Sequence, residues 1–410
     1  MPEVFDSVHG NILLSEIEAK IVSTLTFQRL QFVRQFGIPD TRFFTANHTR
    51  FSHSLGTLYV MDRFLKDGHG DIQDLSEDSK QKLRLAALLH DIGHPPGSHV
   101  LEAAIVNLGG RTHVDCGKSV IMTFLSDVLN QYSAAEISKM ISGHFKSASI
   151  PGVFSSLISS AIDADRLDYL TRDIYFTGVD TPEISIDSII RHVSFRDNKI
   201  IFTGKLAIIS RFLKTRLAMY SNVYLEPKHF GLASVYQYLF SGAVTAGNLE
   251  MPDAVIAKGQ EDKWFQYNDN LAFNTLLSTK CAAKLKNGAF RFLRGIPPYE
   301  IFGIAGVFDL NTAPTKYTII NAIGNSSNLQ RSLAEKLGIP TSNLYVRAAN
   351  PHKIADESYL YVEKGGQQVP IIEASPTLLA LKNKGLFIAR IYSYDDIPQP
   401  AVSKAIKSLV

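Results

Sequence analysis

The sequence predicts a mainly α-helical protein that ends in an α+β lobe. Apolar residues recur at helical spacing from about residue 50 to residue 245, whereas they alternate as in strands after Pro297-Pro298. With 410 residues and 45% hydrophobic content, the chain can bury a large core. We therefore expect a helical domain over residues 1–245, a helical extension over 246–300 and an α+β lobe over 301–410.

Local patterns predict the individual elements. Residues 1–30 should hold a short extended segment and then a helix, and Asp197-Asn198 should form the turn of a hairpin between Ile189–Phe195 and Lys199–Thr203. In the lobe, alternation predicts strands, and a serine at each N-cap predicts helices. The strands are expected at Tyr317–Ala322, Leu344–Ala349, Tyr359–Val362, Val369–Ile372 and Phe387–Tyr394, and the helices at Ser326–Leu337 and Ser375–Asn383.

Composition narrows the cellular setting. A net charge of +3 does not by itself indicate a nucleic-acid partner. The two cysteines, Cys116 and Cys281, are too few for a disulfide framework and fit a reducing compartment. Because no run of 18 apolar residues occurs and Met1-Pro2-Glu3 begins no signal peptide, we expect a soluble cytoplasmic protein with no membrane partner.

A histidine and an aspartate, His90 and Asp91, stand together where an apolar helical segment ends. Gly93 and the prolines that follow it stop that helix. Burying such a pair without compensation costs several kcal/mol, whereas imidazole nitrogen and carboxylate oxygen together suit a divalent metal. The alternative for the dipeptide alone is a capped helix end with a solvated aspartate.

The residues around this pair favour the metal. Seven of the twelve histidines fall between His48 and His113. His53 can project from the first turn of a helix that starts near Arg50, and Asp165 lies in the carboxylate-rich run from Ile162 to Asp173. The pattern predicts a site for Mn, Fe, Mg or Ni with open positions for water and substrate. Its ligands would be His53, His90, Asp91 and Asp165.

Several motifs resemble the HD-domain superfamily of metal-dependent phosphohydrolases. They are Asp6–Ile12, Phe27–Gly37, Arg50–Gly56, His90–His99, Thr112–Asp115 and Ile162–Asp173, so that the likeness covers about residues 1–230. Within the superfamily, the chain is most similar to the dGTPase-like deoxynucleoside triphosphate triphosphohydrolases, which include the catalytic core of the vertebrate enzyme with a sterile-alpha-motif domain. The resemblance implies an HD-domain helical core and a homo-oligomer.

The resemblance also implies roles for individual residues. The four predicted ligands would hold the metal, and Arg50 and Arg166 would hold phosphate oxygens. A metal and fixed cations can absorb the charge of phosphoester cleavage while a base positions the water. The α-phosphate and the attacking water would be surrounded by His94, His99 and His113. The sugar pocket would be lined by Tyr169 and Asp173, and Gln35 would reach the 3′-OH. Sugar and polyphosphate would also be contacted by Tyr224 and Lys228.

Two departures from the family pattern matter. The family places a glutamate beside the histidine that matches His113, whereas Val114 follows here and Asp115 is the nearby carboxylate. The general acid or base is therefore His99 or His113, supported by Glu102 or by Asp115. At the positions of Ser23 and Gln31, the vertebrate enzyme has the residues that read guanine in its regulatory site, so that we do not expect GTP-dependent tetramer activation.

Other residues have plainer interpretations. His48 and His69 lie in polar segments typical of surface loops, and His9 should pack the N-terminal hairpin. Tyr224 could also serve only to pack the interior, without contacting substrate. The basic run Thr279–Lys286 is either a solvated helix face or a contact to polyphosphate or nucleic acid.

The expected activity is cleavage of dNTPs to deoxynucleoside and inorganic triphosphate by water attack at the α-phosphorus. One alternative is another HD phosphohydrolase or phosphodiesterase, acting on a nucleotide monophosphate, cyclic nucleotide or alarmone. A second is a protein that binds single-stranded nucleic acid and hydrolyses weakly, which salt-dependent DNA binding without turnover would reveal. A third is a catalytically inactive regulator.

Overall fold

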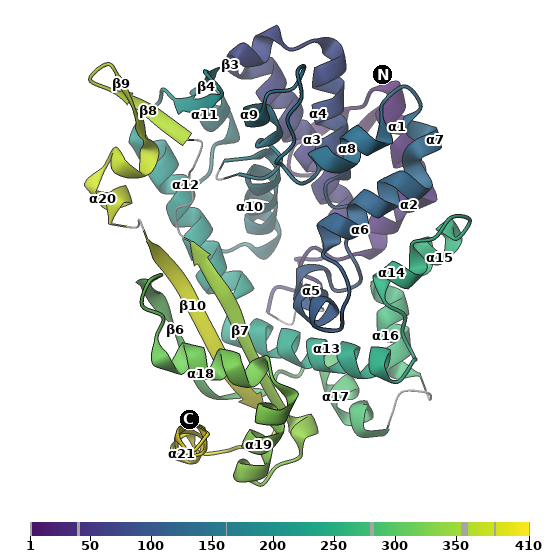
Figure 1. The fold of residues 1–410 in the computed structure, drawn as a ribbon, viewed down its shortest axis with the longest axis vertical. Coiled ribbons are helices and arrows are strands. Elements are labelled where there is room, and N and C mark those ends of the chain that lie inside the picture. The colour runs from purple at the N-terminus through teal and green to yellow at the C-terminus, as the bar shows by residue number, and fades with distance from the viewer. Residues whose placement is uncertain are drawn as a thin grey trace.

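Helices dominate the molecule, as the sequence predicts (Figure 1). The computed structural model describes residues 2–38, 42–160, 162–278, 283–353, 360–380 and 383–409. Helices from the first half of the chain fill the upper part of the view in Figure 1, and a sheet from the C-terminal region lies at the lower left. Within the described ranges, no helix has both the length and the apolar character needed to cross a membrane.

The chain begins as predicted, with an extended segment and then a helix. Strands β1 (Glu3–Asp6) and β2 (Gly10–Leu13) form an antiparallel hairpin. Helix α1 (Glu16–Val22) starts with a capping box, in which the Ser15 side chain accepts from the Glu18 N–H and the Glu18 carboxylate accepts from the Ser15 N–H. A short helix, α2 (Leu25–Gln28), follows. This segment places His9 against the helices that carry the site.

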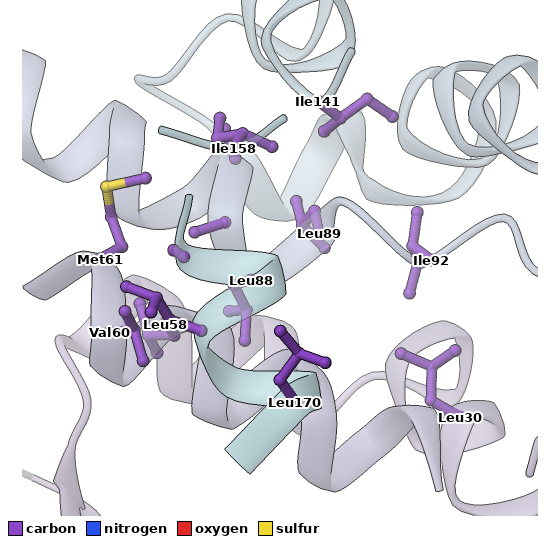
Figure 2. Close-up of a cluster of buried hydrophobic side chains, with 14 of the residues drawn as sticks. Leu30, Leu58, Val60, Met61, Leu88, Leu89, Ile92, Ile141, Ile158 and Leu170 are labelled. Carbon is purple, nitrogen blue, oxygen red and sulfur yellow. The ribbon is translucent and has the colours of Figure 1, made fainter. Parts of the chain in front are cut away.

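Three helices form the centre of the helical domain: α3 (Arg50–Asp67), α4 (Glu77–Leu89) and α10 (Ala164–Thr177). Figure 2 shows their apolar side chains together, among them Leu58 from α3, Leu88 from α4 and Leu170 from α10, all fully buried. Burial of such side chains contributes about 1.5–3 kcal/mol each. This packing holds the ends of the three helices, where the polar residues lie, in a fixed arrangement.

The remaining helices surround this centre. Most of them are short, and α13 is the longest of the group. The elements are α5 (Ser98–Asn107), α6 (His113–Val120), α7 (Ser126–Leu129), α8 (Ala134–Met140), α9 (Gly152–Ser155), α11 (Ile186–Ile190), α12 (Leu206–Met219), α13 (Pro227–Thr245), α14 (Pro252–Val255), α15 (Glu261–Gln266), α16 (Asp269–Leu277) and α17 (Ala283–Leu293).

The predicted hairpin belongs to a larger mixed sheet. Its strands are β4 (Val193–Arg196) and β5 (Lys199–Phe202), and Asp197 and Asn198 both have positive φ in the turn, as a tight hairpin requires. The sheet order is β3-β4-β5-β8-β9, in which β3 is His69–Gly70, β8 is Leu360–Lys364 and β9 is Gln367–Pro370. Because β8 pairs with β5, this sheet joins the C-terminal region to the helical domain.

The second sheet corrects one prediction. Its order is β6-β10-β7, formed by β6 (Tyr299–Asp309), β7 (Leu344–Lys353) and β10 (Lys384–Ser393). The segment predicted as a strand at Tyr317–Ala322 instead lies in helix α18 (Thr315–Gly324). The prediction was wrong because the buried side chains Tyr317, Ile320 and Ile323 recur every three residues, which is a helical face. Strand β6 was not predicted.

Three further helices complete the lobe. Helix α19 (Ser327–Leu337) begins as predicted, with the Ser326 hydroxyl accepting from the Leu329 N–H. Helix α20 (Pro376–Leu379) is shorter than predicted, and residues 381–382 lie outside the described ranges. Helix α21 (Gln399–Lys407) ends the chain and packs on α19.

Candidate active site

The structure brings the four predicted metal ligands together. His53 lies in the first turn of α3, His90 caps the C-terminus of α4, and Asp165 lies in the first turn of α10. The Nε2 atom of His53 is 3.2 Å from Nε2 of His90, 3.5 Å from Oδ2 of Asp91 and 3.1 Å from Oδ1 of Asp165. Nε2 of His90 is 3.3 Å from Oδ1 of Asp91 and 3.6 Å from Oδ1 of Asp165. The donor atoms of three helix ends therefore face one another.

The orientation of the two imidazoles suits a metal ion. Nδ1 of His53 bonds Oδ2 of Asp168 at 2.7 Å, and Nδ1 of His90 bonds the Ala87 carbonyl at 2.8 Å. Because Nδ1 is engaged in both rings, Nε2 is the atom that each ring presents to the cluster, an arrangement typical of metal-bound histidine. Two nitrogen and two oxygen donors fit a divalent cation, and the ligand atoms of His53, His90 and Asp91 lie close enough together to hold one.

The charges within the cluster are strongly coupled. Burial opposes ionisation of Asp165, but hydrogen bonds to His53 and His90 outweigh it and hold the pKa of the Asp165 carboxyl below its usual value. Burial likewise lowers the pKa of His53, but its bonds to Asp165 and Asp168 outweigh this and raise the pKa to about 10. These contacts stabilise the charged forms of both Asp165 and His53.

Asp168 is a buried residue of this site that the sequence analysis missed. Its carboxylate contacts Nδ1 of His53, and Oδ1 lies 2.6 Å from Nε2 of His9. Arg172 donates to Asp168 at 2.9 and 3.0 Å and to Asp6 of the N-terminal hairpin at 2.8 Å. The signal was present in the sequence, because Asp168 stands three residues after Asp165 on the same helix face. His9 packs the hairpin, as predicted, and also reaches the site through Asp168.

A second cluster, the histidine triad, consists of His94, His99 and His113. The rings of His94 and His113 stack with centroids 4.1 Å apart, and His99 lies edge-on to both, at 4.6 and 4.9 Å. Nε2 of His94 is 3.2 Å from Oδ1 of Asp91, so that the triad adjoins the metal ligands. These residues come from the loop after α4 and from the first turns of α5 and α6.

The structure distinguishes the two carboxylates that the sequence left open. Glu102 lies 2.6 Å from Nδ1 of His113 and 3.2 Å from Nδ1 of His99, and also accepts from the His113 backbone N–H at 3.0 Å. Asp115 instead caps α6 with Thr112 and bonds Lys118 at 3.0 Å. Glu102 therefore orients the triad, and Asp115 does not contact it in the described structure.

Electrostatics favour the neutral form of two histidines of the triad. Burial, together with the charges of Arg50 and His113, lowers the pKa of His94 well below its usual value. Desolvation also lowers the pKa of His99, although 58% of that side chain is exposed. Burial opposes ionisation of Glu102, but its bonds to His113 and His99 outweigh this and lower the Glu102 pKa. At neutral pH the site thus combines an ionised Glu102 with neutral His94 and His99.

The two arginines predicted to bind phosphate are engaged within the protein. Arg50 donates to Oδ2 of Asp91 at 2.5 Å and to the Ser98 hydroxyl at 3.2 Å. Arg166 donates its side chain to the Ser160 carbonyl and its backbone N–H to Asp163 at 2.6 Å. Arg50 thus places a buried positive charge directly against Asp91, a predicted metal ligand, at the border of the histidine triad.

The predicted sugar-pocket residues lie beside the metal ligands. The ring of Tyr169 is 6.4 Å from that of His53 and 6.4 Å from that of Tyr224. Tyr224, at the end of a π-helical turn (Tyr220–Tyr224), donates to Asp173 at 2.5 Å.

His48 was expected in a surface loop, but this expectation was wrong, because the ring is buried and lies 2.7 Å from Asp173.

Gln35 carries an unused buried acceptor. Its side-chain Oε1 is buried and has no hydrogen-bond partner among the described residues, whereas its backbone carbonyl accepts weakly from Arg50 at 3.4 Å. A buried acceptor without a partner is costly, so such an atom is a natural contact for a ligand hydroxyl.

Lys228 is exposed in the first turn of α13, and His69 is exposed, as expected. The side chains of residues 279–287, which include the predicted basic run, lie outside the described ones.

Comparison with known families identifies the domain that these helices form. The family model described as "HD domain" matches residues 50–173, which include the four predicted metal ligands, the triad and α10 as far as Asp173. Residues 50–173 therefore match an HD domain, as the motifs indicated. A histidine and aspartate cluster suited to a divalent metal is the expected centre of such a domain.

The relatives differ in what their names state. An uncharacterized protein of Methanocaldococcus jannaschii is 36% identical over 55% of this chain and 46% of its own length. An uncharacterized protein of Bacillus subtilis is 32% identical over 50% of this chain and 47% of its own length. The deoxynucleoside triphosphate triphosphohydrolase SAMHD1 homolog of Dictyostelium discoideum is 26% identical over 53% of this chain and 45% of its own length. The chain thus spans about half the length of the curated relatives it matches.

Solved structures share the fold over the whole chain. A hypothetical protein from Aquifex aeolicus has a TM-score of 0.76 at 23% identity, covering 100% of both chains. A structure titled phosphohydrolase from Bacteroides thetaiotaomicron has a TM-score of 0.72 at 22% identity, covering 96% of this chain and 100% of its own. At these identities the likeness concerns the fold, including the C-terminal region.

Proposed function

We propose that the protein is a metal-dependent dNTP triphosphohydrolase. The observation that carries this proposal is the adjacency of three groups: the metal ligands, the histidine triad with Glu102, and the pocket of Tyr169, Tyr224 and Asp173. Asp91 links the first two groups at 3.2 Å, and Tyr169 stands against the ring of His53. A substrate that spans them carries a phosphate next to a sugar. Relatives named deoxynucleoside triphosphate triphosphohydrolase support the same substrate class.

The site residues provide the means to cleave a phosphoester. A divalent metal held by His53, His90, Asp91 and Asp165 would supply Lewis-acid polarisation of a phosphoryl oxygen. Glu102 fixes Nδ1 of His113, which leaves the opposite nitrogen of that ring to take a proton from water or to give one to the leaving sugar oxygen. His94, held neutral by burial and by the charge of Arg50, can bind water or a phosphoryl oxygen without a full charge.

Sugar recognition would come from Tyr169 on α10 and from Gln35. Tyr169 stands four residues after Asp165, one helical turn along α10, so a phosphate near Asp165 brings the attached sugar towards the ring. A ring packed against C2′ would exclude a 2′-hydroxyl sterically. The 3′-hydroxyl would donate to Oε1 of Gln35, which is buried and without a partner among the described residues.

The decisive experiment identifies the products. Protein reconstituted with Mn, Fe, Mg or Ni is incubated with each dNTP and each rNTP, and the products are resolved by ion exchange. We expect deoxynucleoside and inorganic triphosphate from dNTPs, with the label from oxygen-18 water in the triphosphate. Orthophosphate or pyrophosphate as the labelled product would contradict attack at the α-phosphorus, and His90→Ala provides the matched control for metal-dependent turnover.

A further inference from the structure

A cationic pocket lies outside the residues used by the proposed reaction. It opens between helix α6, the end of helix α8 and the loop that follows α8. The cavity measures about 430 Å³ and is lined by Lys118, Lys139, Ser142, His144, Phe145 and Lys146. We propose that this cationic pocket is a second binding site for a polyphosphate, separate from the HD-domain centre.

The positive charge of the pocket favours binding of an anion. Three lysine ammonium groups line one small cavity, although the whole chain has a net charge of only +3. Asp115 pairs with Lys118 at 3.0 Å, whereas Lys139 and Lys146 have no ion-pair partner among the described residues. Lys139 and Lys146 are exposed, and like charges that line one cavity repel one another, so that an anion bound among them would reduce this repulsion. Lysine is a usual partner of phosphate, which it binds as a point charge.

The shape of the pocket narrows the class of ligand. Its volume lies within the range of about 300–1,000 Å³ typical of small-molecule sites. Three cations spaced around such a cavity match several linked phosphates better than a single carboxylate. Phe145, which is partly buried, gives the pocket one apolar wall, so that both inorganic triphosphate and the phosphate chain of a nucleotide fit this chemistry.

The pocket is distinct from the active site but shares a helix with it. Lys118 stands five residues after His113 on α6. Gly93 of the His90–His94 loop packs so closely on the backbone of α6, at His113 and Gly117, that a side chain at position 93 would have no space without movement. Binding at Lys118 therefore occurs on a helix that is fixed to the HD-domain centre. Binding of a polyphosphate at this pocket does not depend on hydrolysis of dNTPs at the HD-domain centre.

Lysine acylation read by mass spectrometry tests the site residue by residue. The intact protein is treated with an acetylating reagent in the presence of inorganic triphosphate, dGMP or neither. We expect triphosphate to slow acetylation of Lys118, Lys139 and Lys146 at least fivefold, with exposed Lys364 unchanged. Lys228 provides a separate reading of the proposed active site, so that occupation of the two sites is distinguished in one experiment.

A double variant then tests whether the pocket itself is responsible. Lys139→Glu/Lys146→Glu should abolish the protection of Lys118, whereas Lys364→Glu/Lys407→Glu, which makes the same change of charge on exposed residues of β8 and α21, should retain it. The proposal is overturned if triphosphate leaves all three pocket lysines unprotected, if dGMP alone protects them, or if the double variant keeps the protection of Lys118. Protection by triphosphate but not by dGMP assigns the phosphate chain as the recognised group.

Discussion

The role of Glu102 provides the sharpest test of the proposed mechanism. In Glu102→Gln, the side chain keeps its size and can still accept a hydrogen bond, but the negative charge that holds His113 and His99 is lost. The two carboxylate oxygens lie 2.6 Å from Nδ1 of His113 and 3.2 Å from Nδ1 of His99. Hydrogen bonds to a charged group contribute about 1.5–3 kcal/mol each, and we expect most of one such bond to be lost from the transition state.

The expected effect is a fall in kcat of roughly 10- to 100-fold, because about 1.4 kcal/mol corresponds to a tenfold change in rate. KM should change little, since Glu102 acts through the imidazoles and does not contact substrate in the proposed mechanism. The assay is release of triphosphate under saturating dNTP, with metal content measured in parallel. Asp115→Asn is the matched control and should stay within about threefold of the intact protein.

The pH dependence adds a second check. Hydrogen bonds to His113 and His99 lower the pKa of Glu102 despite burial, so the carboxylate stays ionised in the folded protein as pH falls through its usual range. The defect of the glutamine variant should therefore be constant from about pH 6 to pH 8. An Asp115→Asn defect as large as that of Glu102→Gln, or a Glu102→Gln variant with unchanged kcat, would refute the assignment.

Three further outcomes follow from the geometry. His90→Ala should lose both bound metal and turnover while circular dichroism still shows the helical core, and stoichiometric metal in the variant would contradict the ligand set. Asp168→Asn should lower the free energy of unfolding by about 3–5 kcal/mol in urea, because Arg172 is then buried beside an uncharged amide; a loss below about 1 kcal/mol would show that Asp6 compensates. The intact protein should cleave dNTPs at least tenfold better than rNTPs, about 1.4 kcal/mol in the barrier, and Tyr169→Ala should narrow this ratio; an unchanged ratio would make Tyr169 a packing residue.

Some features of the site could be predicted from the sequence because they are local. The helix that ends at His90 is stopped by glycine and prolines, and the His90-Asp91 pair at such an end is recognisable without its partners. The first-turn position of His53 follows from the helical spacing after Arg50. These residues are close in the sequence to the signals that determine their conformation, so periodicity and stop signals place them.

Other features depend on contacts between distant segments. His48 lies in a segment without helical or strand pattern, and only packing against α10 buries it beside Asp173, 125 residues away in the chain. Asp168 pairs locally with Arg172, four residues along α10, but its contact with His9 joins residues 159 apart in the chain, which no local rule predicts. Tyr317–Ala322 contains β-branched and aromatic residues that favour a strand, but the face that it buries against the sheet has helical spacing.

The sequence by itself determined the helical class and the segments that carry the proposed metal ligands, because helix signals and ligand chemistry are properties of the residues. The tertiary structure decided which carboxylate serves which histidine. Glu102 and Asp115 are both near His113 in the sequence, and both are compatible with the motif. Glu102 reaches His113 because α5 and α6 bring that face of each helix together, whereas the capping interaction with Thr112 and the pairing with Lys118 hold Asp115 away. The relative orientation of α5 and α6, which the spacing of residues along the chain does not specify, therefore determines that Glu102 and not Asp115 contacts His113.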